Sequence, residues 1–134
     1  MIVVDTNVIA YLWIPGLHTS QAESALRKDA NWVAPLLWRS EFRNILSGYI
    51  RRNQIPFDTA MQLIEEAEDH LKGREYTVSL VHVLNLVKKS PCSAYDCEFV
   101  ALAEDLEIPL LTTDRKILSA FLSVAVSLGK FSIK

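Results

Sequence analysis

Short apolar runs alternate with segments of helical spacing along the whole chain, and this alternation constrains the fold more than any other feature. The first run, Ile2-Val3-Val4, is β-branched and predicts a buried strand. Strands are expected at 2–4, 32–34, 76–78, 109–112 and 124–128, and helices at 8–13, 19–28, 36–52, 60–71, 79–89, 94–106 and 114–122. Strands separated by helices predict an α/β domain with a mainly parallel central sheet flanked by helices.

Length and composition narrow the class of protein. The 134 residues match one domain, expected over 1–134, and a chain that is 50% hydrophobic and 22% charged is not intrinsically disordered. The formal net charge of -2 argues against a protein that coats nucleic acid non-specifically, since such proteins are basic. No signal peptide is seen at the start, and the charge-free run 117–129 is too short for a membrane span, so we expect a cytoplasmic protein with no membrane partner.

The two cysteines indicate neither a disulfide framework nor a zinc site. Cys92 and Cys97 are not spaced as C-x-x-C, and no His/Cys cluster accompanies them. They are expected to be reduced thiols in the core.

Two aspartates follow predicted strands directly. Asp5 comes after the first strand, and Asp114 follows the 109–112 strand after one residue. Because ligand sites of parallel sheets form at the carboxyl ends of strands, both positions are candidates for chemistry. The alternative is that each caps the helix that follows, a role that Asp fills well.

Two further acids lie on apolar helix faces. Glu41 stacks with Ile45 and Tyr49 at four-residue spacing, and Asp96 shares its face with Phe99, Val100 and Ala103. Acids are rarely buried without a partner. The alternatives are a salt bridge to Arg39, Arg43 or Arg115, or a position at the rim of the face that reaches water.

If the four acids converge, their mutual repulsion requires a cation or bound protons. Two unit charges about 4 Å apart interact by about 4 kcal/mol at an effective dielectric near 20. An all-oxygen site without His or Cys suits Mg²⁺ or Mn²⁺. The chemistry expected of such a site is phosphodiester hydrolysis by a metal-activated water.

The residues around these acids resemble the motifs of PIN-domain ribonucleases. The segment 3–9 (VVDTNVI) resembles the opening motif, Glu41 within 38–42 (WRSEF) the helical glutamate, 93–97 (SAYDC) the Y-D-A segment, and 111–115 (LTTDR) the T-x-D segment. Their order and spacing agree over essentially the whole chain. The size and bare domain resemble VapC toxins of VapBC toxin–antitoxin systems.

The resemblance implies a Mg²⁺- or Mn²⁺-dependent endoribonuclease, usually a homodimer or higher oligomer, inhibited by a VapB-type antitoxin. It implies that Asp5, Glu41, Asp96 and Asp114 are catalytic, metal-binding acids, supported by Thr6, Asn7 and Thr112. Two departures from the motifs are visible. Cys97 replaces the commoner alanine, and Arg115-Lys116 stand where many relatives carry another acid, which bears on a second metal position.

Basic and apolar residues near the motifs are candidates for partner contacts. Arg39, Arg43, Arg115 and Lys116 are expected to contact RNA phosphates, with surface salt bridges as the alternative. Apolar residues Trp13, Leu17, Trp38 and Tyr49 are candidates for binding an antitoxin or a second subunit. Core packing is the alternative for these four, and it is favoured for most of them.

Two other function classes remain open on the residues. An aspartyl-nucleophile phosphatase would also place an aspartate after a strand, but it normally carries a second aspartate two residues later, where this chain has Asn7. A non-catalytic module, either receiver-type or an inactive PIN-like relative, would suit the length. Asp5 has no acidic neighbour of the kind a receiver needs, and none of the four acids is lost.

Overall fold

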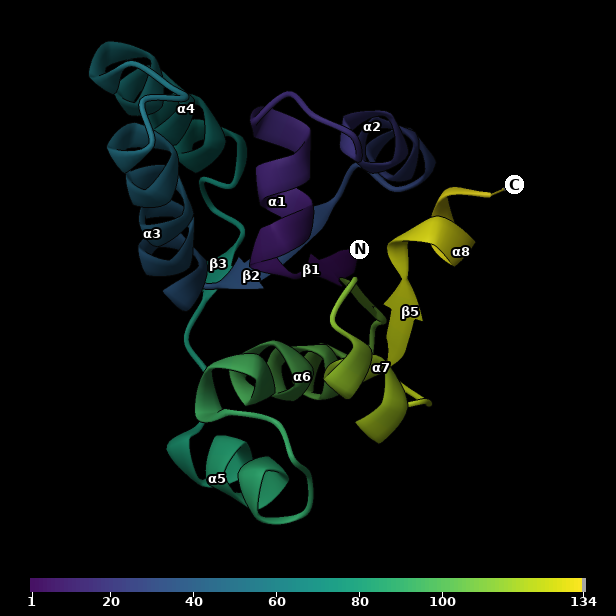
Figure 1. Cartoon of the computed structure of the whole chain (residues 1–134). Coiled ribbons are helices and arrows are strands. Elements are labelled where there is room, and N and C mark those ends of the chain that lie inside the picture. Colours follow the sequence, from purple (N-terminus) through teal and green to yellow (C-terminus); the bar gives the residue numbers. More distant parts are fainter. Residues whose placement is uncertain (134) are drawn as a thin grey trace.

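A five-stranded parallel sheet forms the centre of the computed structural model, which describes residues 1–133 (Figure 1). The strand order is β3-β2-β1-β4-β5, and all neighbouring pairs are parallel. The strands are β1 Ile2–Val4, β2 Trp32–Pro35, β3 Glu75–Tyr76, β4 Leu110–Thr112 and β5 Ala125–Ser127. The sequence-based expectation of a helix-flanked α/β sheet is confirmed.

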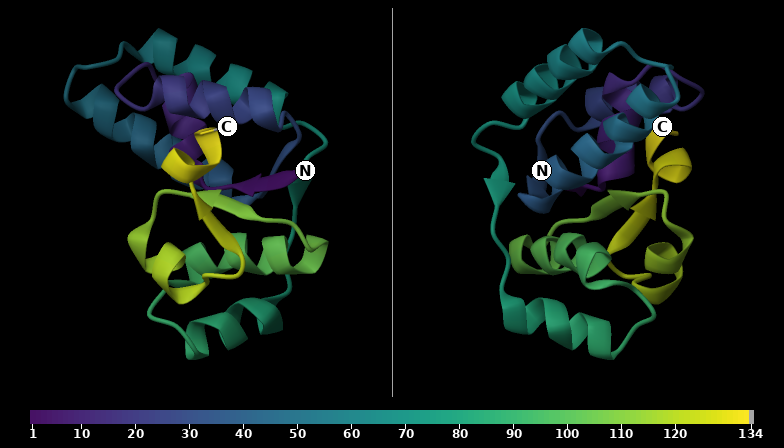
Figure 2. Two further views of the ribbon diagram at one scale, coloured as in Figure 1. Left: turned by 90° about the vertical axis from the view of Figure 1, so that its right-hand side faces the viewer. Right: turned by 60° about the vertical axis from the view of Figure 1, so that its left-hand side comes forward.

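Helices cover both faces of the sheet. Figures 1 and 2 show α1 to α4 on one face and α5 to α7 on the other. The helices are α1 Thr6–Trp13, α2 Thr19–Lys28, α3 Leu37–Arg51, α4 Phe57–His70, α5 Leu80–Lys88, α6 Ala94–Leu106, α7 Arg115–Ala120 and α8 Leu128–Ser132. The C-terminal α8 lies against α2, where Lys28 Nζ donates a 3.0 Å hydrogen bond to the Phe131 carbonyl.

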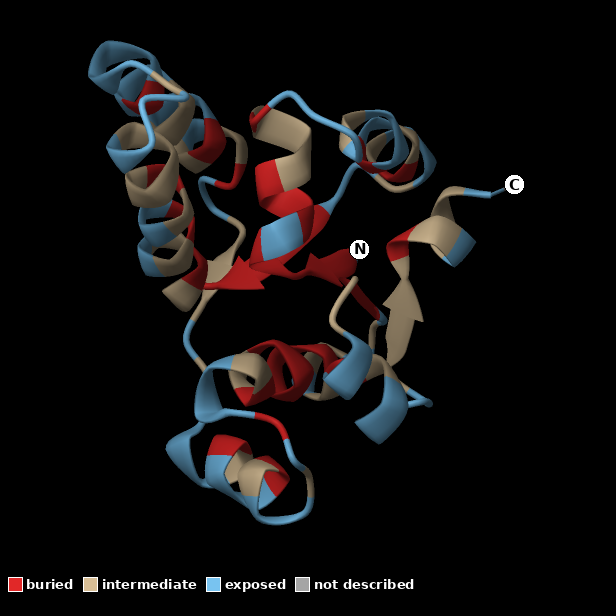
Figure 3. Ribbon diagram, in the orientation of Figure 1, coloured by how far each residue is buried: buried red, intermediate tan, exposed pale blue. Residues whose placement is uncertain are grey.

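The core lies on both sides of the strands. Every residue of β1, β2 and β4 is buried, which is typical of parallel strands covered by helices on both faces (Figure 3). Trp38 and Phe42 of α3 fill one side, and Phe99 of α6 fills the other. Cys92 and Cys97 are buried free thiols, as expected.

Several local expectations differ from the structure. The helix expected at 60–71 begins earlier, at Phe57 after Pro56, so Asp58 lies within its first turn. The strand expected at 76–78 is shorter and shifted, at Glu75–Tyr76. The short helix α8 was not expected, and it is capped by Ser127, whose hydroxyl accepts from Lys130 N. Among residues 1–133, no helix has both the length and the apolar character needed to cross a bilayer.

The strand order creates a topological switch point between β1 and β4. From central β1 the chain adds β2 and then β3 on one side, and β4 and β5 on the other. The amide of Asp5 donates to the Leu111 carbonyl at 2.9 Å, so the carboxyl ends of β1 and β4 are joined where the side chains leave the sheet. Crevices at such points are the usual ligand sites of open α/β sheets.

Candidate functional site

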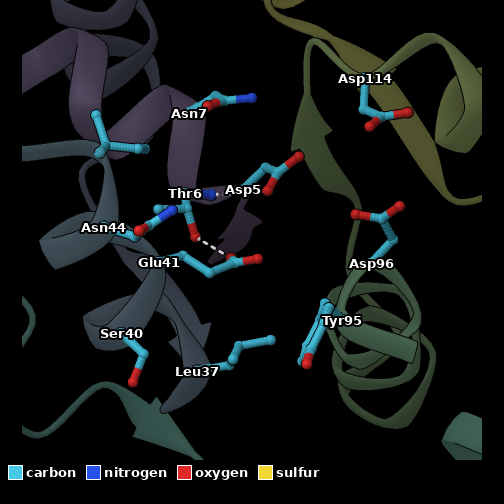
Figure 4. A pocket seen from close by; sticks show the side chains of 11 residues that line it. Asp5, Thr6, Asn7, Leu37, Ser40, Glu41, Asn44, Tyr95, Asp96 and Asp114 are labelled. Carbon is cyan, nitrogen blue, oxygen red and sulfur yellow. Dashed lines mark hydrogen bonds between the residues drawn. The ribbon is translucent and has the colours of Figure 1, made fainter. Parts of the chain in front are cut away.

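The four acids singled out in the sequence line one cavity at the carboxyl edge of the sheet (Figure 4). Its volume is about 530 Å³. The lining residues are Asp5, Thr6, Asn7, Leu37, Ser40, Glu41, Asn44, Ile45, Tyr95, Asp96 and Asp114. No lysine or arginine is among them, so this acid cavity concentrates negative charge.

Asp5 lies at the bottom of the acid cavity and is almost fully buried. Its side chain is 8% exposed; Oδ1 accepts from the Thr6 amide at 2.8 Å and Oδ2 from the Thr112 hydroxyl at 2.7 Å. Burial raises the pKa of Asp5 to about 6, with smaller contributions from the negative charges of Asp96 and Asp114, and the two hydrogen bonds oppose this rise. Asp5 is also the N-cap of α1, so the expected capping role and the place in the cavity coexist.

Glu41 reaches the acid cavity from α3 and is held by the neighbouring strand–helix junction. The Thr6 hydroxyl donates to Glu41 Oε1 at 2.6 Å. Partial burial raises the pKa of Glu41, and the charge of Asp5 adds to the rise. No salt bridge joins Glu41 to any residue of the described chain, so the salt-bridge alternative does not account for its position.

Asp96 and Asp114 approach from the opposite side of the cavity. Asp96 lies in the first turn of α6, and burial together with the charge of Asp114 raises its pKa. Asp114 caps α7 by accepting from the Ile117 amide at 3.1 Å, while its own amide donates to the Thr112 hydroxyl at 3.0 Å. The capping alternative therefore also holds for Asp114, and its carboxylate still lines the cavity.

Of the three residues expected to support the acids, two bond to them directly. Thr6 contacts Asp5 and Glu41, and Thr112 connects Asp5 to the Asp114 backbone. Asn7 lines the cavity and is exposed, and its side chain makes no hydrogen bond to residues 1–133.

The four cations expected to contact RNA fall into two groups. Arg39 forms a two-pronged pair with Glu75 at 2.6 and 2.7 Å, and both Arg39 and Arg43 bond to Glu68. These two arginines lie outside the acid cavity, and the salt-bridge alternative describes them. Arg115 and Lys116 are exposed and follow Asp114 directly.

The apolar residues considered for partner binding also divide. Trp38 is fully buried and donates to Glu75 at 2.7 Å, so it belongs to the core and not to a surface. Trp13 and Tyr49 are partly buried, whereas Leu17 is 91% exposed.

Several cavity residues were missed in the sequence. Leu37 and Asn44 are four and three positions from Glu41 along α3, so extending the helical face around that acid identifies them. Tyr95 precedes Asp96 and is 61% exposed at the cavity.

The donor chemistry of the cavity fits a hard divalent cation. The candidate ligands are four carboxylates without a cationic partner in the cavity, and three of them have raised pKa values. Carboxylate oxygens without His or Cys are the ligands that Mg²⁺ and Mn²⁺ favour. Within residues 1–133 no group of three or more His, Cys, Asp or Glu side chains is arranged to hold a metal ion, so the fit lies in the donor set and the shared cavity.

Comparisons with known proteins agree with this architecture. A family model described as "PIN domain" matches residues 2–121. Ribonuclease VapC3 of Pyrobaculum aerophilum is 32% identical over 123 residues, which cover 90% of this chain and 94% of that protein.

Two solved structures share the fold at low sequence identity. PAE2754 from Pyrobaculum aerophilum superposes with a TM-score of 0.79 at 16% identity, covering 98% of this chain and 93% of the other. FitAcB from Neisseria gonorrhoeae gives a TM-score of 0.76 at 15% identity, covering 96% and 99%.

Proposed function

This chain belongs to the PIN domain family, and on that premise we propose that it is a divalent-metal-dependent endoribonuclease of the VapC toxin type. The observation that carries the proposal is the convergence of Asp5, Glu41, Asp96 and Asp114, from four separate elements, on one cavity without a basic residue. The similarity to a protein named Ribonuclease VapC3 over 90% of the chain supports RNA as the substrate.

The acids have different surroundings and hence different proposed roles. Asp5 and Asp96, with Asp114 nearby, would hold Mg²⁺ or Mn²⁺, and Glu41 would complete the site or orient the attacking water. When bound, the cation would supply Lewis-acid activation of water and stabilise the charge on the leaving oxygen.

The chain's own residues position these groups. Thr6 and Thr112 each donate to Asp5 and so fix the direction of its carboxylate. Thr6 also holds Glu41 through Oε1, which leaves Oε2 without a hydrogen bond to the described residues. The raised pKa of Glu41 brings it closer to the range in which a carboxylate accepts a proton from water. Arg115 and Lys116, next to Asp114, would contact flanking phosphates.

A cleavage assay on defined RNAs tests the proposal. The wild-type chain is expected to cut in Mg²⁺ or Mn²⁺ and to be inactive in EDTA. Asp5→Asn is expected to lose cleavage, whereas the matched control Asp69→Asn, an exposed acid on α4, should cut like wild type. Cleavage that persists in Asp5→Asn or in EDTA would overturn the assigned chemistry.

The proposed partner is a VapB-type antitoxin, and the proposed assembly is a homodimer or higher oligomer. The VapC name of the 32% identical relative supports the antitoxin, and the resemblance of the motifs supports both proposals. Co-expression with a VapB-type antitoxin protein should give a complex in which RNA cleavage is inhibited. A monomer in solution that neither binds nor is inhibited by that protein would contradict the partner assignment.

A further inference from the structure

A second cavity of about 330 Å³ adjoins the acid cavity. Asn7 and Ile45 line both, so the two form one continuous groove. The second part, here called the side groove, lies between α1, the turn at 15–18 and α3. Figure 1 shows α1 and α3 next to each other above the sheet. An RNA strand bound at the four acids can therefore continue into the side groove along the protein surface.

Aromatic rings line the side groove. The rings of Tyr11 and His18 lie with centroids 4.7 Å apart and planes tilted by 44°. His18 is exposed, and Tyr11 is partly buried on α1. Tyr49 lines the groove from α3. Such rings provide stacking surfaces for a planar ligand.

The turn that carries His18 is held in place by its neighbours. Thr19 Oγ1 accepts from the Gly16 amide at 2.9 Å, and the Thr19 amide donates to the Gly16 carbonyl at 3.3 Å. The His18 backbone is therefore fixed between two bonded residues.

The polar character of the side groove indicates a neutral ligand. No Asp, Glu, Lys or Arg lines it, although the Arg52 guanidinium lies 5.2 Å from the centre of the Tyr49 ring, so the lining itself offers no permanent charge to a phosphate or to an ionic side chain. The Asn7 amide and the Tyr11 hydroxyl make no hydrogen bond to residues 1–133, and both are positioned to bond to a ligand in the groove. Aromatic faces with a few free amide and hydroxyl groups are typical of sites for unpaired RNA bases.

We propose that the side groove is a nucleobase subsite. The base of a nucleotide next to the scissile phosphate stacks on the Tyr11–His18 pair, and Asn7, at the junction, bonds to its edge or to its ribose. This assignment rests on the proposed RNase function and adds a residue set that positions the RNA strand. It also makes substrate affinity depend on residues outside the acid cavity.

An abasic scan of a cleaved oligoribonucleotide tests the subsite. Removing one base at a time should identify one position near the cut whose loss lowers kcat/KM roughly tenfold, mainly through KM. His18→Ala should cause a similar loss with the intact RNA and no further loss with that abasic RNA. His18→Phe should restore most of the affinity, and Tyr11→Leu should behave like His18→Ala. Leu122→Ala, at an exposed position that does not line the groove, is the control.

The outcomes separate the subsite from the proposed function. If the wild-type chain cuts RNA but His18→Ala and Tyr11→Leu leave the abasic scan unchanged, the subsite is wrong and the groove is left to a protein partner. If the wild-type chain cuts no RNA, the proposed function fails. Fluorescence of 2-aminopurine in an oligoribonucleotide then decides the subsite: quenching by Asp5→Asn protein that His18→Ala abolishes supports it, and no quenching overturns it.

Discussion

The hydroxyl of Thr112 donates a 2.7 Å hydrogen bond to Asp5 Oδ2, joining residues 107 positions apart in the chain. The same oxygen accepts from the Asp114 amide, so one threonine connects the acids that follow β1 and β4. The donated bond also opposes the effect of burial on the pKa of Asp5. Thr112 is therefore placed to support both the fold and the direction of the Asp5 carboxylate.

Thr112→Val is expected to destabilise the fold and weaken cleavage together. A buried acceptor that loses its donor costs about 1–3 kcal/mol, and the pKa of Asp5 should rise further. Thr112→Ser keeps the hydroxyl and should retain most of both properties. Urea denaturation and cleavage rates measure the two effects. Equal behaviour of the valine and serine variants would show that the hydroxyl has no such role.

Asp5→Asn should stabilise the metal-free chain at neutral pH while abolishing cleavage. The folded-state pKa of about 6 exceeds the ordinary 3.8, so ionisation of Asp5 costs the folded state stability. The penalty is absent below about pH 4, grows between pH 4 and 6, and levels off at about 3 kcal/mol above pH 6. The stability difference between variant and wild type, measured in EDTA from pH 4 to 8, should follow this course. A difference that does not change with pH would contradict the burial argument.

Mg²⁺ or Mn²⁺ should raise the melting temperature of the wild-type chain. A cation that binds the folded state alone stabilises by about 2.7 kcal/mol at one hundred times its Kd. The shift should be strongly reduced in Asp96→Asn, whose carboxylate lines the acid cavity, and retained in Asp105→Asn, on the same helix but outside it. No shift in wild type at millimolar cation would exclude a shared metal site.

The two arginine-containing regions should respond differently to neutralisation. Arg39→Gln leaves Glu75, whose side chain is 10% exposed, without its two-pronged partner and should destabilise by about 1–3 kcal/mol. Arg43→Gln, 53% exposed, should change stability by less than about 1 kcal/mol. Neither should alter the salt dependence of RNA binding, whereas Arg115→Gln or Lys116→Gln should weaken binding and lower its salt slope. A weaker salt dependence of RNA binding in Arg43→Gln would instead show that Arg43 contacts a phosphate.

His70 should make stability fall in mild acid, opposite in sign to Asp5. Its Nδ1 is buried without a hydrogen bond to the described residues, edge-on to Trp13 and Trp32, and burial followed by the Arg74 charge lowers its pKa. The unfolded chain therefore binds more protons below about pH 6.5, the ordinary His value. His70→Phe should remove this loss in denaturation experiments between pH 7 and 5. An unchanged pH profile would show that His70 protonates freely in the folded chain.

The parts of the fold that depend on local pattern could be predicted, and those that depend on distant partners could not. Asp5 and Asp114 were identified because each follows an apolar strand, and Glu41 because it interrupts an apolar helix face. The pairing of Arg39 with Glu75 spans 36 positions, so no local spacing reveals it. The same pairing, with the Trp38 hydrogen bond to Glu75, explains why Trp38 is a core residue.

Short elements and cavities formed by several elements were harder to predict from the sequence. The five-residue α8 follows β5 directly, and the strand pattern over this region did not predict a helix. In the structure, Ser127 caps α8. The side groove could not be predicted either, because it depends on α1 and α3 being adjacent, which the order of elements alone does not specify.

Asp5 follows β1 and Asp114 follows β4, and both line the acid cavity. The two strands pair directly with each other. During synthesis, β1 can pair with β2 early, whereas its other neighbour, β4, is made only after most of the chain. A nascent or truncated polypeptide that ends before β4 has neither Asp114 nor the Thr112 bond to Asp5. The proposed nuclease site is thus complete only when translation of the chain is nearly finished.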